Sequence, residues 1–281
     1  DGVVREDVYK VGGLYGKALE KIKLFVLDMD GTFYFDDEII EGSLEFLEAV
    51  KESGRDYIFF TNNSSKSPSI YIKRLAGMNC FIERNQIMTS GDVTIKYLQT
   101  NYADKTVYLV GTPALEETFI EAGIKLTKEM PDIVVVGFDM TLTYEKLERA
   151  CTYIRNGALF LATHLDINCP TKEGFIPDCG AFCAAITLST GVQPRYLGKP
   201  FKETVDMVLA STGYAREEIA FVGDRLYTDV ATGVKNGANG FLVLTGETHL
   251  EDVEKSEVKP DVIYDSLYEI GCCIRELEGK K

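Results

Sequence analysis

The sequence contains no apolar run long enough to cross a membrane. A membrane helix needs about 18 to 20 consecutive apolar residues, and no such stretch occurs in the 281 residues. The amino-terminal segment also lacks the basic and then apolar pattern of a secretory signal. We therefore expect a cytoplasmic protein without a membrane partner.

Cysteine pairs and histidines are also scarce. The seven cysteines form no C-x-x-C pair, which argues against a disulfide scaffold and against a zinc knuckle. We expect them to be reduced and mostly buried. His164 and His249 are the two histidines of the chain, so catalysis based on several histidines is difficult to build.

Positively charged residues are fewer than negatively charged ones. The chain has 30 Lys and Arg against 44 Asp and Glu, a formal net charge of -14, and no basic stripe interrupts it. This balance disfavours nucleic acid as a partner. An anionic substrate would need a bound cation and a local lysine to reverse the sign of the field at its site.

What the sequence does contain is an alternation of apolar, strand-like runs with helical patterns. This rhythm is typical of βαβ units, and the length suits one large domain or two linked domains. A helix is predicted at 43–53, ended by Gly54. The predicted strands lie at 24–27, 57–60, 86–89, 106–110, 133–136, 159–162, 219–222 and 240–244.

Two aspartates, Asp28 and Asp30, follow the first apolar run and are followed by Gly31 and Thr32. In open α/β sheets, chemistry gathers at the carboxyl ends of the strands. On an ideal strand both carboxylates would leave the same face, and a cation or a shared proton would have to relieve their repulsion. A hard divalent metal is the simplest relief. The same residues also fit a strand followed by a polar Asp-Gly turn.

A polar run, Thr61-Asn62-Asn63-Ser64-Ser65, follows the second predicted strand. Hydroxyls and successive backbone N–H groups at a strand end, facing a helix start, form a cradle for an anion such as phosphate. A turn whose side chains bond to the nearby backbone explains the same residues equally well.

One lysine and two further acids occur late in the chain. Lys199 lies between Gly and Pro where a helix begins, although a lone lysine is usually exposed. Asp224 ends a second apolar strand, and Asp229 follows five residues later. Two strands that each end in Asp provide oxygen ligands for a divalent cation. Asp229 would bond to these groups and hold Lys199 in place.

These motifs, in this order, resemble the four signature motifs of the haloacid dehalogenase superfamily. The chain is more closely similar to its NagD/4-nitrophenylphosphatase subfamily, over about residues 22 to 270. The segments that carry this closer resemblance are 61–65, 174–180, 198–200 and 223–229.

The resemblance implies an α/β fold of two parts. The first is a Rossmann-like core whose parallel sheet is flanked by helices, at 1–103 and 194–281. The second is an inserted, smaller α/β cap domain of the C2 type, at 104–193, which governs substrate specificity. Relatives often pair through their caps, which suggests a homodimer.

The implied activity is Mg²⁺-dependent hydrolysis of small organic phosphate monoesters, such as sugar phosphates, nucleotides and glycerol phosphates. Asp28 would be the nucleophile that forms an aspartyl-phosphate, and Asp30 the general acid and base. Mg²⁺ would be held by Asp28, by the backbone carbonyl of Asp30 and by Asp224. Asp229 would contact these ligands without binding the metal itself. Lys199 would be catalytic. The implied phosphate and substrate contacts are Gly31, Thr61, Asn62, Asn63, Lys199 and Asp166.

Other functions stay open at this point. A phosphomutase or phosphotransferase of the same superfamily would use the same motifs, and a non-catalytic protein could bind a phosphorylated ligand. His164 stands where relatives usually carry Asn followed by Pro-Asp, which leaves the substrate undefined, while Asp166 keeps its expected position. The segment 174–180 resembles the substrate-specificity loop and also fits a simple Gly/Pro turn.

Overall fold

The structure, a computed structural model, describes residues 14–279. These residues form two compact units. The first comprises residues 14–60, 72–87 and 205–279, and the second comprises residues 61–71 and 88–204. Residues 1–13 and 280–281 of the predicted core segments lie outside the described residues. The predicted boundaries of the cap, 104 and 193, stay predictions.

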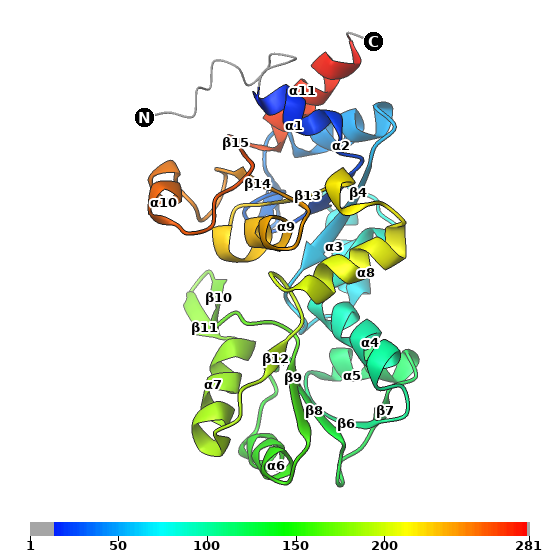
Figure 1. Cartoon of the computed structure of the whole chain (residues 1–281), viewed down its shortest axis with the longest axis vertical. Helices are drawn as coiled ribbons and strands as arrows, with labels where there is room; N and C mark the ends of the chain where they lie inside the picture. Colours follow the sequence, from blue (N-terminus) through cyan, green and yellow to red (C-terminus); the bar gives the residue numbers. More distant parts are fainter. Residues whose placement is uncertain (1–13, 280–281) are drawn as a thin grey trace. The chain divides into compact units, whose positions relative to one another are not determined.

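The first unit is built on a six-stranded sheet (Figure 1). Strand β1 pairs in parallel with β13 and β4, β13 with β14, and β14 with β15. Every residue of β1, β13 and β14 is buried, as expected for a parallel sheet that is covered on both faces. The strand order is β15 (Val262–Tyr264), β14 (Asn239–Val243), β13 (Ile219–Gly223), β1 (Leu24–Leu27), β4 (Asp56–Thr61) and β5 (Ile87–Thr89).

Helices cover this sheet. Helix α11 packs against both α1 and α2, and Phe46 of α2 meets Phe25 of β1 edge-to-face at 5.4 Å between ring centroids. Helix α9 packs against β13 and β14. The helices of this unit are α1 (Leu14–Glu20), α2 (Ser43–Glu52), α9 (Ala231–Lys235), α10 (Leu250–Lys255) and α11 (Leu267–Glu278), and α3 (Pro68–Ala76) and α8 (Lys202–Thr212) begin in the second unit.

Short elements complete the first unit. A π-helical turn, η4 (Leu226–Val230), leads from β13 into α9, and a two-stranded hairpin joins β2 (Tyr34–Phe35) to β3 (Glu38–Ile39). Two 3-10 turns, η2 (Arg84–Gln86) and η3 (Arg216–Glu218), precede β5 and β13. The loop after β1 and the turn after β13 therefore start from adjacent strands.

The second unit has a five-stranded sheet of its own, in which all four strand pairs are parallel. Its order is β12 (Arg195–Tyr196), β9 (Leu159–Ala162), β8 (Ile133–Val136), β6 (Thr106–Val110) and β7 (Lys125–Leu126). An antiparallel hairpin of β10 (Asn168–Thr171) and β11 (Gly174–Pro177) follows β9. The helices are α4 (Ser90–Asn101), α5 (Pro113–Glu121), α6 (Tyr144–Arg155) and α7 (Cys179–Thr190). Side chains of α6 and α7 form one apolar core with β6, β8 and β9.

The prediction of an α/β protein with parallel sheets flanked by helices is confirmed. All eight predicted strands occur within a residue or so of their expected places. All seven cysteines are free thiols, five of them buried. Within residues 14–279, no helix has both the length and the apolar character needed to cross a membrane.

Candidate active site

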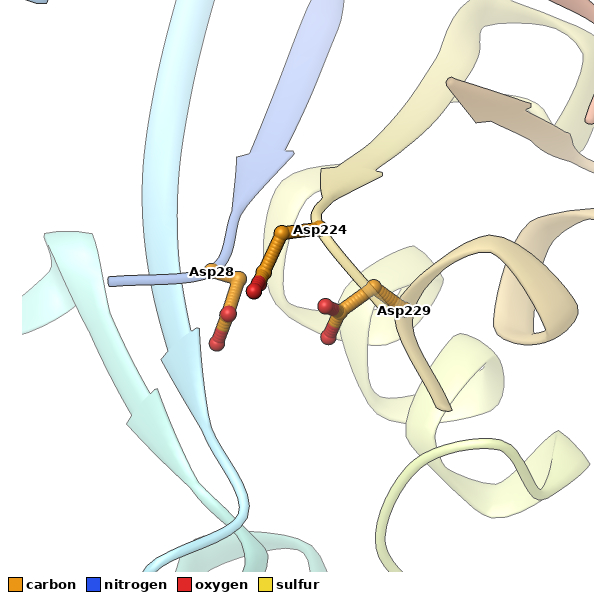
Figure 2. Close-up of side chains that lie close together, drawn as sticks. All are labelled: Asp28, Asp224 and Asp229. Carbon is orange, nitrogen blue, oxygen red and sulfur yellow. The ribbon is translucent and has the colours of Figure 1, made fainter. Parts of the chain in front are cut away.

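Three carboxylates meet at the carboxyl ends of β1 and β13 in the first unit. Asp28 and Asp224 each follow the last residue of their strand, and the register Leu27 to Val222 brings the two strand ends level. Asp229 lies in η4 and points toward the same place (Figure 2). Ligand oxygens of the three side chains lie within 4.8 Å of one another. We call these residues the carboxylate cluster.

The cluster concentrates negative charge in a place with little water. Asp224 is buried, and its pKa is raised by this burial and by the neighbouring charge of Asp229. The N–H of Glu247, which donates to Asp224 Oδ2 at 2.8 Å, acts in the opposite direction. Three oxygen ligands at this spacing match the preference of a hard divalent cation. The donor set therefore fits the divalent metal site that the sequence predicts.

Arg225 is a cation that the sequence analysis missed. Burial alone would lower the pKa of its guanidinium, but Asp28 and Asp229, followed by Glu247 and Asp224, raise it, so the group stays charged. Its backbone N–H also donates to Asp229 Oδ2 at 3.2 Å. The only signal for this role in the sequence is its place directly after Asp224. Arg225 offsets part of the charge of the carboxylate cluster.

The structure corrects the expectation that Asp28 and Asp30 share one face of an ideal strand. Strand β1 ends at Leu27, so the alternation of side chains does not extend to Asp30. The Asp30 side chain is exposed, and Asp229 takes the third place in the carboxylate cluster. Partial loss of water around the Asp30 carboxyl raises its pKa, and Arg225 opposes this shift. A raised pKa suits a group that has to carry a proton.

Gly31 allows the loop after Asp30 to pass close to the carboxylate cluster. Its φ of 83° lies in the left-handed region, and a Cβ at this position would stand 2.5 Å from Asp224 Oδ2. The Gly31 N–H donates to the carbonyl of Tyr34 at 2.9 Å, and its carbonyl accepts from Thr245 Oγ1 at 2.7 Å. A side chain here would displace Asp224.

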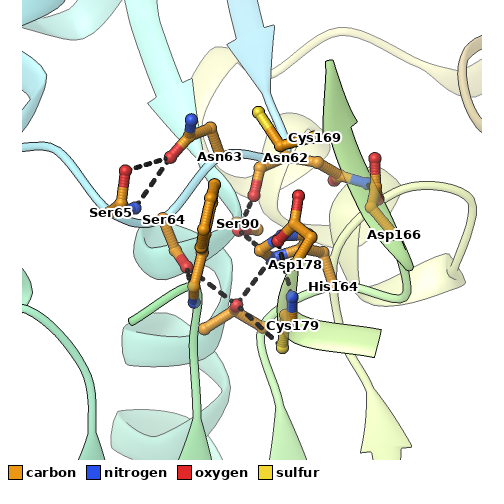
Figure 3. Close-up of polar contacts among 12 residues, drawn as sticks. Asn62, Asn63, Ser64, Ser65, Ser90, His164, Asp166, Cys169, Asp178 and Cys179 are labelled. Atoms are coloured by element: carbon orange, nitrogen blue, oxygen red, sulfur yellow. Dashed lines mark hydrogen bonds and ion pairs between the residues drawn. The ribbon is translucent and has the colours of Figure 1, made fainter. Parts of the chain in front are cut away.

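In the second unit, the polar run that starts at the last residue of β4 forms two small turns, and Figure 3 shows the contacts between Asn63 and Ser65. The N–H of Asn63 donates to Thr61 Oγ1 at 3.1 Å, and Asn63 Oδ1 accepts from the N–H and the hydroxyl of Ser65 at 2.8 and 2.6 Å. These are the local side-chain-to-backbone bonds that the turn interpretation expects. The phosphate contacts of Thr61, Asn62 and Asn63 stay a prediction.

Three predicted residues come together in the second unit. The Asn62 carboxamide bonds to the backbone of Lys199, through Nδ2 to the carbonyl at 3.1 Å and from the N–H to Oδ1 at 2.9 Å. The same Nδ2 donates to Asp166 Oδ1 at 3.0 Å. Lys199 is 4 % exposed, so it is not the solvent-exposed side chain that a lone lysine usually is.

His164 belongs to a buried network that the sequence did not indicate. Its Nε2 lies 2.7 Å from Asp178 Oδ1, and its Nδ1 lies 2.7 Å from Thr163 Oγ1 and 3.4 Å from Ser90 Oγ (Figure 3). Asp178 is the N-cap of α7, where its carboxylate accepts from the N–H of Cys179. The pair ties the segment after β9 to the start of α7.

This pair predicts a pH dependence of stability. Burial lowers the pKa of His164, but Cys179, Asp178 and Asp166 raise it to about 9, above the ordinary value of 6.5. Burial raises the pKa of Cys179 well above its ordinary value of 9. Because the folded pKa is raised, the contribution of His164 to the free energy of unfolding is present below pH 6.5 and is lost as pH rises through about 9.

Urea unfolding between pH 6 and 10 measures this effect. The His164→Asn variant is expected to lose the decrease in unfolding free energy over that range. The exposed His249, changed to Asn, serves as the control and should retain it. An unchanged slope in His164→Asn would contradict the assignment.

Comparison with known proteins identifies the family and the fold. Residues 25–125 match a family model described as haloacid dehalogenase-like hydrolase, and residues 196–270 match one described as HAD-hydrolase-like. A 4-nitrophenylphosphatase from Thermotoga maritima shares 47 % identity, with 90 % of this chain and 98 % of that chain covered and a TM-score of 0.87. NagD from Escherichia coli K-12 shares 32 % identity, with 88 % and 98 % covered and a TM-score of 0.83.

Relatives of similar sequence include proteins named as phosphatases and a nucleotidase. The 5'-nucleotidase YutF of Bacillus subtilis is 35 % identical over 251 residues, which are 89 % of this chain and 98 % of that protein. An acid sugar phosphatase of Staphylococcus epidermidis is 32 % identical over 261 residues, 92 % and 100 % of the two chains. The chain belongs to the haloacid dehalogenase-like hydrolases. Within them it is a NagD-like phosphoric monoester hydrolase, with a Rossmann-like core and a cap.

Proposed function

We propose that the protein is a Mg²⁺-dependent phosphatase that hydrolyses small organic phosphate monoesters through an aspartyl-phosphate on Asp28. The carboxylate cluster at the ends of β1 and β13 is the observation that carries this proposal. The substrate is a small phosphorylated metabolite, and neither nucleic acid nor a membrane takes part. We also propose a cytoplasmic location and, on the resemblance, a homodimer.

The metal site follows from the donor set. Asp28, Asp224 and the backbone carbonyl of Asp30 would hold Mg²⁺, and Asp229, within the same cluster, would keep these ligands in place. When bound, Mg²⁺ supplies positive charge that reduces the repulsion between the Asp28 carboxylate and the phosphate it attacks. The pKa of Asp224 is raised by its burial and by the charge of Asp229, and a bound cation would favour its charged form.

The reaction divides into two displacements. In the first, an Asp28 oxygen attacks phosphorus, the bond to the leaving oxygen breaks, and Asp30 gives that oxygen its proton. In the second, Asp30 takes a proton from water, the water oxygen attacks phosphorus, and Asp28 is released as a carboxylate with inorganic phosphate. Thr61, the N–H of Asn62 and Lys199 stabilise the charge on the transferring phosphoryl oxygens.

Asp224→Asn is expected to raise the Mg²⁺ concentration for half-maximal activity by at least about tenfold, because one charged ligand is lost. Metal-free Asp224→Asn should unfold no earlier than the metal-free wild type, since the substitution relieves repulsion by Asp229. Thermal unfolding and activity, each titrated with Mg²⁺, measure both effects. An unchanged metal titration would remove Asp224 from the ligand set.

Phosphate release from p-nitrophenyl phosphate, with Mg²⁺ and with a chelator, tests the function as a whole. Turnover that depends on the metal supports the proposal. A panel of sugar phosphates, nucleotides and glycerol phosphates then defines the substrate, since the relatives include proteins named as a 5'-nucleotidase and an acid sugar phosphatase. Phosphate that appears only on an added acceptor would instead indicate a phosphotransferase, and no turnover at all would contradict the proposal.

A further inference from the structure

The Asn62 carboxamide forms a closed pair of hydrogen bonds with the backbone of Lys199. The Lys199 N–H donates to Asn62 Oδ1 at 2.9 Å, and Asn62 Nδ2 donates to the Lys199 carbonyl at 3.1 Å. Both residues are buried, with 8 % and 4 % of their surface exposed. Two bonds to one peptide segment restrain its rotation as well as its distance.

The orientation of this amide is fixed by its partners. Nδ2 carries two hydrogens, which go to the Lys199 carbonyl and to Asp166 Oδ1, and a carbonyl oxygen can only accept. Rotating the amide by 180° would place its oxygen against these two oxygens and its NH₂ against the Lys199 N–H. The arrangement with the oxygen toward the Lys199 N–H is therefore the only satisfied one.

The backbone segments that carry Asn62 and Lys199 are themselves fixed by close contacts and hydrogen bonds. A Cβ at Gly198 would lie 2.7 Å from Asn62 Oδ1 and 2.7 Å from the carbonyl of Thr163, so the chain before Lys199 passes directly against both groups. The Gly198 N–H donates to the Thr163 carbonyl at 2.7 Å. The Ser90 hydroxyl donates to the carbonyl of Asn62. The Lys199 Cα therefore has a defined position relative to β9 and the start of α4.

We propose that Asn62 is a positioning residue: its side chain holds Lys199 in place. This extends the proposed function, in which the backbone N–H of Asn62 binds the phosphoryl group, by giving the Asn62 side chain a separate role. The Asn62 carboxamide is hydrogen-bonded to Lys199 and Asp166. It therefore affects the reaction by fixing the position of the Lys199 ammonium group. A displacement of about 1 Å in a catalytic group can cost on the order of 100-fold in rate. The inference rests on the proposed role of Lys199.

A double-mutant cycle with Lys199 tests this proposal. In wild-type background, Asn62→Ala should lower kcat on p-nitrophenyl phosphate about 30- to 100-fold, with a smaller change in KM. With Lys199→Met, the same change should lower kcat less than about threefold, because no ammonium remains to be positioned. Equal losses in both backgrounds, or wild-type kcat in Asn62→Ala, would overturn the proposal.

The same double-mutant cycle can be measured by calorimetry as the binding of inorganic phosphate in the presence of Mg²⁺. This measurement also covers variants whose turnover is too slow to follow. The same pattern is expected: Asn62→Ala weakens phosphate binding when Lys199 is present and leaves it unchanged with Lys199→Met. Asn62→Asp has nearly the same shape but loses both donated bonds, so it should be at least as impaired as Asn62→Ala. Wild-type activity in Asn62→Asp would also overturn the proposal.

A matched control separates positioning from general stability. Asn239 is likewise buried, and its Nδ2 donates to the carbonyls of Glu217 and Ile219 at 3.2 and 2.9 Å. Asn239→Ala should lower the melting temperature and leave kcat unchanged. If Lys199→Met itself keeps full activity, the proposed role of Lys199 fails. If Lys199→Met loses activity and Asn62→Ala does not, only the positioning role fails.

Discussion

Asp28→Asn should lower kcat on p-nitrophenyl phosphate by at least about 1,000-fold, the order of loss seen when a catalytic nucleophile is removed. The side-chain amide at this position has no charge and cannot form the acyl phosphate that water later opens. The substitution keeps the shape of the side chain at the end of β1, so the loss reports on chemistry. Steady-state phosphate release at saturating Mg²⁺ measures it.

Two controls accompany this variant. Asp206→Asn changes an aspartate on helix α8 that pairs with Arg216 and should retain wild-type activity. The melting temperature of metal-free Asp28→Asn should be equal to or above that of the wild type, because one charge leaves the carboxylate cluster. Substantial turnover by Asp28→Asn would contradict the assignment of the nucleophile.

Asp30→Asn should separate the two displacements. The p-nitrophenolate group leaves readily without a proton, so the first displacement continues, while hydrolysis of the aspartyl-phosphate loses its general base. We expect a rapid release of p-nitrophenol equal to one per active site, followed by turnover slowed at least about 100-fold. An alkyl phosphate, which needs a proton on its leaving oxygen, should give no such burst. Stopped-flow absorbance measures the burst.

The pH dependence supplies the control for Asp30. Its pKa is raised by partial loss of water, so the wild type should keep the protonated acid to higher pH than an ordinary aspartate would. For an alkyl phosphate, kcat/KM of the wild type should fall as rising pH removes the Asp30 proton, and this fall should be absent in Asp30→Asn. Slow, linear release of p-nitrophenol without a burst would contradict the division of roles between Asp28 and Asp30.

The framework of the molecule was accessible from the sequence because its strands are short apolar runs that end in polar residues. Val134 and Phe221 lie in strands whose residues are almost all buried, and such runs stand out against the charged helices. The strand ends then located Asp28 and Asp224. Their meeting follows from the parallel pairing of β1 with β13.

The elements that were not predicted are short or depend on distant partners. Strands β7 and β12 have two residues each, too few for any pattern to appear. The place of Asp229 beside Asp28 and Asp224 was predicted, but the π-helical turn η4 that carries it was not. The bonds of Asn62 to Lys199 and of His164 to Asp178 join segments remote in sequence, and single-sequence patterns carry no information about such contacts.

The most direct test of the central claim is to detect the phosphoryl group on Asp28. Asp30→Asn, mixed with p-nitrophenyl phosphate and Mg²⁺, is quenched in acid during the burst and digested for mass spectrometry. The account predicts that the peptide carrying Asp28 gains the mass of one phosphoryl group, which hydroxylamine removes, and that Asp28→Asn/Asp30→Asn gains none. An unmodified Asp28 peptide at the height of the burst would contradict the account.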